Sequence, residues 1–106
     1  MSLGQAYFNP KLLGETAILT WNWASKIIDP AVTISTAVIT STVYSGTDAS
    51  PSSMISGSAT ISGYNVTQKI TGGVLGVVYQ LLCTITTSDG QTLQMPGFLA
   101  VVPNVV

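Results

Sequence analysis

Apolar and polar residues alternate along much of this chain, and a period of two predicts β-strands rather than helices. The clearest run ends at Thr87, and one of its parities is apolar throughout: Tyr79, Leu81, Cys83 and Ile85. The other parity is mostly polar and is expected to meet water. Ser88-Asp89-Gly90 follows, and its glycine can take the positive φ that a tight turn needs. The pattern therefore predicts a hairpin into a last strand at Thr92–Val102.

The same alternation predicts four strands before this hairpin: Thr16–Trp23, Val32–Tyr44, Met54–Ser62 and Tyr64–Thr71. Trp21 and Trp23 share the apolar face of the first strand, so we expect both indoles in the core or at its edge. In the second strand the apolar positions change parity between Val38 and Ile39, which predicts a β-bulge or a change of sheet. Pro96 cannot donate to a ladder, so the last strand is expected to bend, lie at an edge or change partner there.

These elements predict an all-β protein, an immunoglobulin-like β-sandwich of about seven strands. A glycine-rich corner, a tyrosine that enters a strand and a final hairpin are how such a sandwich ends. The 106 residues suffice for one domain, which we place at residues 15–106. Residues 1–14 are expected to form an N-terminal arm, because Asn9-Pro10 breaks any regular element and Gly14 frees the backbone.

The arm is too apolar for a terminal segment that makes no contacts, and its only charged side chain is that of Lys11. Its large apolar residues are our candidate interaction residues: Leu3, Tyr7, Phe8, Leu12 and Leu13. Such side chains either cover their own sandwich or insert into a neighbouring subunit. We expect the neighbour, because a sandwich of this size fills its inner faces with its own strands.

Charged residues make up 7% of the chain, against about 25% in an ordinary soluble domain. A surface with so few charges is poorly protected against association, which favours a subunit that packs against neighbours. Three basic residues and a net charge of −1 cannot form the basic patch that nucleic acid requires. No apolar run is long enough to span a membrane, and the first residues lack the pattern of a secretory leader.

Groups that carry catalysis or bind metals are scarce. The chain has no histidine, and its four acidic residues are far apart in sequence: Glu15, Asp29, Asp48 and Asp89. Cys83 has no histidine to activate it and is expected to be a small buried side chain. Gly72-Gly73-x-x-Gly76 lies between strands with no helix after it, which indicates a backbone corner rather than a phosphate site. We therefore expect no enzyme activity, no cofactor and no metal.

Three sequence motifs of this chain together resemble those of a known protein family. They are Leu19-Thr20-Trp21-Asn22-Trp23 followed by Ile27, Gly72-Gly73-x-x-Gly76-x-x-Tyr79, and Thr86-Thr87-Ser88-Asp89-Gly90-Gln91-Thr92. Through them the chain resembles, from Glu15 to Val102, the small immunoglobulin-like structural proteins of tailed bacteriophages. Those proteins are often labelled fibre-like, and some are proposed to decorate or cement the capsid. Where that family often has a tryptophan in the second strand, this chain has Thr36-Ala37-Val38-Ile39. The resemblance brings no catalytic residues.

The resemblance implies a structural protein of the virion, made in the host cytoplasm. We expect a capsid decoration or cement subunit that joins neighbouring subunits and is oligomeric in the particle. Its partners would be the major capsid protein or its own copies. Two alternatives remain open. One is a head–tail adaptor, tail or fibre-base component, and the other is a carbohydrate-binding module that uses Trp21, Trp23 or Tyr44.

Overall fold

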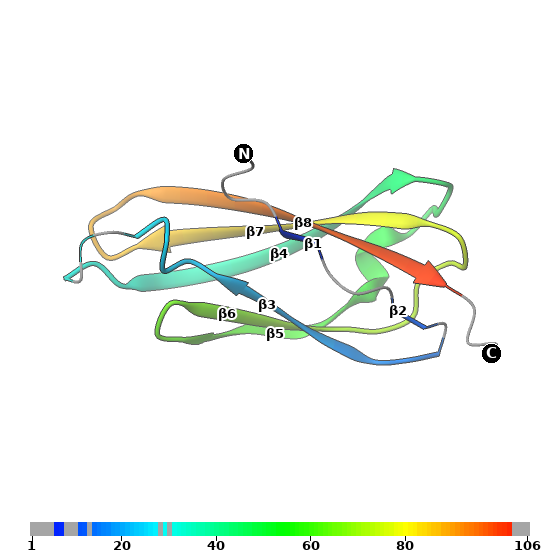
Figure 1. Cartoon of the computed structure of the whole chain (residues 1–106), viewed down its shortest axis with the longest axis horizontal. Helices are drawn as coiled ribbons and strands as arrows, with labels where there is room; N and C mark the ends of the chain where they lie inside the picture. The colour runs from blue at the N-terminus through cyan, green and yellow to red at the C-terminus, as the bar shows by residue number, and fades with distance from the viewer. Residues whose placement is uncertain (1–5, 8–10, 13, 28, 30, 103–106) are drawn as a thin grey trace.

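The computed structural model describes residues 6–7, 11–12, 14–27, 29 and 31–102, and these form an all-β structure of two facing sheets (Figure 1). The smaller sheet has the order β3-β6-β5, from β3 (Ala17–Asn22), β6 (Asn65–Ile70) and β5 (Ile55–Ser62). The larger sheet is built on β4 (Ile34–Ser45), β7 (Val78–Thr87) and β8 (Thr92–Val102). A 3₁₀ turn at Pro51–Met54 precedes β5. Among the described residues no helix is long and apolar enough to cross a membrane.

The six longer strands confirm the strands predicted from the alternation. β7 and β8 form the expected hairpin, with registers from Val78↔Ala100 to Thr86↔Thr92. A bulge in the second predicted strand is confirmed, but the register shifts lie between Ile34 and Thr36 and between Val43 and Ser45. The ladder is regular at Val38 and Ile39, where the parity change was expected, and Val38 faces outward. Pro96 remains paired with Leu82 of β7, and β8 keeps this partner on both sides of the proline.

The core lies between the sheets and is filled by the apolar parities of the strands. Trp21, Leu81, Cys83 and Ile85 are fully buried, as predicted. Trp23, just beyond the end of β3, is equally buried. The core therefore contains both tryptophans, together with apolar side chains from both sheets.

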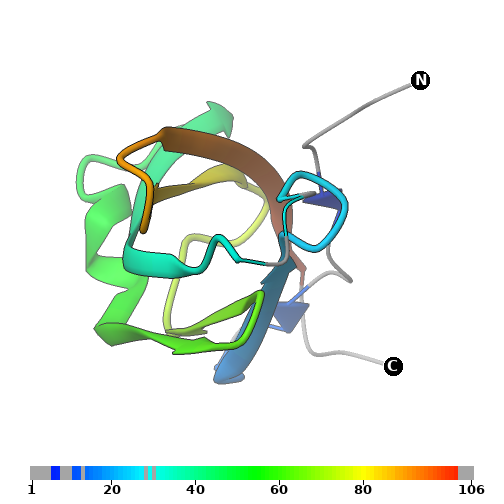
Figure 2. The same cartoon turned by 90° about the vertical axis from the view of Figure 1, so that its left-hand side faces the viewer.

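The N-terminal segment adds two short parallel strands to the free edge of β8. β1 (Ala6–Tyr7) pairs with Gly97 and Phe98, and β2 (Lys11–Leu12) pairs with Val101 and Val102. Both segments therefore lie along their own sandwich, close to where β8 and β3 converge (Figure 2). We expected the arm to reach a neighbour. The backbone of these two segments pairs with β8 of the same chain, and an interaction of the side chains with a neighbour stays a prediction. The physical reason for the pairing is that the edge of β8 has backbone groups that need partners.

Candidate functional site

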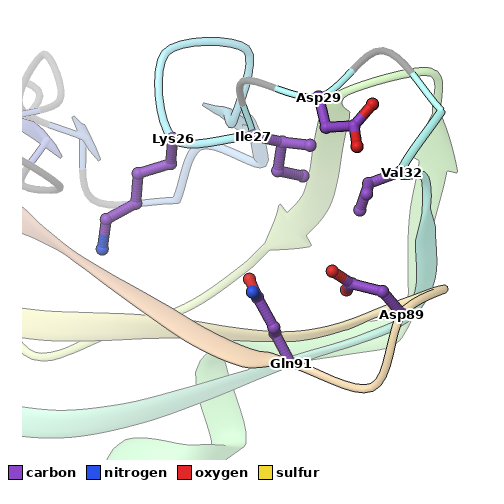
Figure 3. Close-up of a pocket in the computed structure, with 6 residues that line it drawn as sticks. All are labelled: Lys26, Ile27, Asp29, Val32, Asp89 and Gln91. Atoms are coloured by element: carbon purple, nitrogen blue, oxygen red, sulfur yellow. The ribbon is translucent and has the colours of Figure 1, made fainter.

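A pocket of about 340 Å³ opens where the β3–β4 connection meets the β7–β8 turn (Figure 3). Its lining residues are Lys26, Ile27, Asp29, Val32, Asp89 and Gln91. The two loops are tied together, because the Ser88 amide donates to the Thr33 carbonyl at 2.8 Å and the Thr33 amide donates to the Ser88 hydroxyl at 3.0 Å. The fold thus brings Asp29 and Asp89 to one pocket, although they are far apart in sequence.

The charged groups of this pocket are already hydrogen-bonded to neighbouring backbone or side-chain groups. Asp29 accepts a hydrogen bond from the Ala31 amide at 2.9 Å, and Asp89 accepts one from the Thr87 hydroxyl. The ammonium of Lys26 is directed away from both carboxylates in Figure 3 and donates to the Gln94 carbonyl of β8 at 3.0 Å. In the part of the chain that the structure describes, no three His, Cys, Asp or Glu residues gather as a metal site. We therefore assign the pocket a structural role.

A second polar cluster lies at the corner before β7. Tyr79 is fully buried, and its hydroxyl accepts a hydrogen bond from the Val74 amide at 2.7 Å. This contact confirms the prediction that the hydroxyl bonds to backbone of the preceding turn. The same hydroxyl donates to the Asp48 carboxylate at 2.7 Å, a partner that the sequence did not reveal. The corner is therefore held to the β4–β5 loop as well as to its own turn.

Replacing Tyr79 by phenylalanine should lower the free energy of unfolding by about 1 kcal/mol or more. The variant leaves the Val74 amide without this acceptor and removes one of the two donors to Asp48, whose bond from the Ser50 amide remains. Urea denaturation of the purified protein measures the loss. Tyr44→Phe is the matched control, because its ring is 66% exposed and its change should be close to zero. Equal stability of the two variants would contradict the assigned role of the Tyr79 hydroxyl.

The same cluster makes stability depend on pH. The Tyr79 hydroxyl and the Ser50 amide both donate to Asp48 and hold its pKa below the ordinary value of 3.8. A lowered pKa favours the folded state above the unfolded-state value, and this contribution is lost as the pH falls through the folded-state pKa. Burial and the hydrogen bond to Asp48 raise the pKa of Tyr79 above 10.0, so its contribution is lost as the pH rises through that raised value.

Asp48→Asn should therefore flatten the acid side of the stability profile. As the pH falls below the ordinary value of 3.8 and through the lowered folded-state pKa of Asp48, we expect the urea midpoint of the natural chain to fall more steeply than that of the variant. Asp29→Asn is the control, because Asp29 is an exposed carboxylate that caps only its own turn. A parallel fall in natural chain and Asp48→Asn variant would show that this carboxylate does not carry the effect.

Cys83 is buried on the inner face of β7, as predicted. Burial raises the pKa of its thiol to about 12, although the neighbouring Trp23 indole lowers it. A thiol that stays protonated is a poor nucleophile. Cys83 is thus part of the packing.

Among the described residues, the outer face formed by β4, β7 and β8 has no charged residue in its strands, and we call it the neutral face. Its residues are the outward-facing ones of the three long strands: Thr36, Val38, Thr40, Thr42 and Tyr44 of β4; Val78, Gln80, Leu82, Thr84 and Thr86 of β7; Thr92, Gln94, Pro96, Phe98, Ala100 and Val102 of β8. The Tyr44 and Phe98 rings meet edge to face over the central strand, with centroids 4.8 Å apart. Val38 and Tyr44 are 58% and 66% exposed. This face is half apolar and half neutral polar.

Two of the five predicted interaction residues fall in the two short strands. Tyr7 belongs to β1 and Leu12 to β2, and the backbone of each pairs with β8. Leu3, Phe8 and Leu13 lie outside the described residues. An interaction role for these five side chains stays a prediction. Lys11, between them in sequence, is only 1% exposed, which the sequence did not indicate for a lysine.

The buried tryptophans correct one of the alternatives. Trp21 and Trp23 each have no exposed surface, so neither ring can stack on a sugar. A carbohydrate platform that uses these tryptophans is therefore wrong, because their rings fill the core. Tyr44 is the remaining aromatic residue of that hypothesis, and its ring packs against Phe98.

The family comparison decides the broad class of the protein. Residues 11–99 match the family model Gp77, described as "Podophage GP4 fiber-tail adaptor protein gp77". The chain belongs to this family. Membership of the Gp77 family makes it a bacteriophage structural protein, as the sequence motifs implied, with its place in the virion among other virion proteins. The matched residues run from β2 into β8 and include all of the smaller sheet. No curated protein and no solved structure gives a significant match.

Proposed function

We propose that this chain is a fibre–tail adaptor subunit, which joins the fibre of a podophage to its tail through protein–protein contacts. The observation that carries the proposal is the match to the Gp77 family over residues 11–99. The low charge of the chain supports it, because a subunit that remains packed against neighbours does not need charge to stay soluble. The role requires no catalysis, and the polar groups described above are bonded within turns and corners.

We further propose that the sandwich is of the immunoglobulin type. In support, β3-β6-β5 faces β4-β7-β8, and the chain passes between the sheets in the order that this type of sandwich uses. The buried Tyr79 before the last hairpin also fits, since such sandwiches place a hydrogen-bonded tyrosine near this corner. A sandwich held by its core can present its outer faces and its terminal segment to partners.

The capsid decoration role is a second candidate. It is favoured by the resemblance from Glu15 to Val102, and it uses the same low charge and the same terminal segment. In either role the arm residues Tyr7 and Leu12 would contribute contacts to a virion protein or to another copy. The two roles differ in location: an adaptor lies where fibre meets tail, and a decoration protein lies over the capsid shell.

The test is a phage from which the gene is deleted, with the protein supplied from a plasmid as the control. For an adaptor, we expect the deletion to give filled heads with tails that lack fibres, and complementation to restore the fibres. Electron microscopy and quantification of the fibre protein in purified particles measure the result. Particles that keep their fibres but lose shell stability would instead support the decoration role.

A further inference from the structure

We propose that the neutral face binds the neutral face of a second copy, so that two chains associate through their β4-β7-β8 sheets. This inference goes beyond the adaptor role, because it concerns the chain alone. It rests on the charge, shape and size of one described surface.

The distribution of charge favours a second copy. The charged side chains belong to other strands, turns and loops, and that of Lys26 reaches β8 at the Gln94 carbonyl. They are Lys11, Glu15, Lys26, Asp29, Asp48, Lys69 and Asp89. A charged partner surface would lose its hydration on this face without meeting an opposite charge, which is costly. Like charges that meet across a symmetric interface repel, and the described strands of this face contribute none. The occupant that fits is therefore an uncharged sheet face, and this chain provides one.

The shape of the face suits symmetric packing. Two sheets stack about 10 Å apart with their strands within about 30° of each other. The middle row of the neutral face contains Thr40, Leu82 and Pro96, which are paired across the three strands. Leu82 is half-buried on the central strand, so a two-fold axis close to it would bring the two copies of this leucine together.

The size of the face predicts a weak dimer. Three strands about 4.8 Å apart and about 35 Å long present roughly 500 Å². Stable complexes bury about 800 Å² on each partner, so this interface is at the low end of the size range of protein–protein interfaces. We expect association at concentrations of tens of micromolar or above. A particle that holds several copies close together would raise the effective concentration to that range.

Sedimentation velocity of the purified full chain, from about 10 µM to about 1 mM, tests the proposal. We expect a reversible monomer–dimer equilibrium. Leu82→Glu and Leu82→Lys should each weaken the dimer at least tenfold, because two like charges then meet near the axis. An equimolar mixture of the two variants should associate again, because opposite charges meet. Ile18→Glu is the matched control: Ile18 is 67% exposed on the outer face of the smaller sheet, and its variant should dimerise like the natural chain.

Circular dichroism shows whether the variants are folded. If the Leu82 variants do not fold, Val38→Glu and Tyr44→Glu replace them, because both positions are exposed on the neutral face. A natural chain that stays monomeric up to about 1 mM would overturn the proposal. So would folded face variants that dimerise as well as Ile18→Glu. The virion location would stand in either case, since these measurements use no phage particle.

Discussion

Trp21→Ala is expected to reduce the free energy of unfolding by about 3 to 5 kcal/mol. Trp21 has no exposed surface and lies on the inner face of β3, opposite Val66 of β6. Removing the indole loses its burial and leaves a cavity that surrounding side chains fill only in part. The total free energy of unfolding of a domain of this size is about 5 to 15 kcal/mol, so the variant should be close to unfolding. Urea denaturation with fluorescence detection measures the change.

The control for this variant is on the same strand. Ile18→Ala changes an outward side chain that is 67% exposed, and it should cost less than about 0.5 kcal/mol. The strand backbone is common to both variants, so the difference reports burial alone. If Trp21→Ala unfolds at the same urea concentration as Ile18→Ala, Trp21 does not support the core.

Gly73→Ala is expected to cost about 2 to 4 kcal/mol, from strain and from crowding together. Gly73 has a φ of +98°, which side chains rarely adopt. A Cβ at this position would also lie 2.8 Å from Val101 Cγ2 and 3.2 Å from Met54 Cε. The corner before β7 therefore needs glycine for its conformation and for the close approach of β8.

Gly72→Ala separates these two causes. Gly72 also has a positive φ, +65°, but a Cβ there would meet open space. Gly72→Ala should therefore lower the free energy of unfolding only through backbone strain, by about 1 to 2 kcal/mol. The difference between the two alanine variants in thermal unfolding gives the contribution of packing against Val101. Equal costs would show that crowding at Gly73 is relieved by small movements.

The strands, the core and the β7 corner could be predicted because alternation and turn residues encode them locally. The burial of Trp21, the presence of a bulge in β4 and the contact of Tyr79 with its own turn all follow from such patterns, whereas the position of the bulge near Ile34 does not. The Asp48 contact could not be predicted, because it joins two loops whose approach depends on the whole sandwich. Nothing in the local sequence separates Asp48 from any other loop carboxylate.

Gln68 shows the same limit inside a strand. It occupies the apolar parity of β6 and is 2% exposed, and its side-chain amide donates to the carbonyls of Ser56 and Gly57 at 2.9 and 3.2 Å. The register shift of β5 between Ser56 and Thr60 leaves these carbonyls free to accept from the glutamine side chain. A buried glutamine needs hydrogen-bond partners, which here come from the shifted part of β5, and the glycine- and serine-rich sequence of β5 does not specify its register.

The site was harder to predict than the fold. The apolar composition of the arm indicated contact with another surface, but it did not show that Ala6–Tyr7 and Lys11–Leu12 would pair with β8. The neutral face emerges only when three strands are aligned in register, because each strand alone looks like an ordinary half-polar strand. Its lack of charge is a property of the sheet.

The copy number of this chain in purified virions tests the adaptor role most directly. Quantitative mass spectrometry with labelled standards gives its ratio to the fibre protein and to the major capsid protein. The adaptor role predicts a copy number in a fixed small ratio to the fibre protein, far below that of the capsid protein. A copy number that follows the capsid protein would contradict the adaptor role and place the chain on the shell.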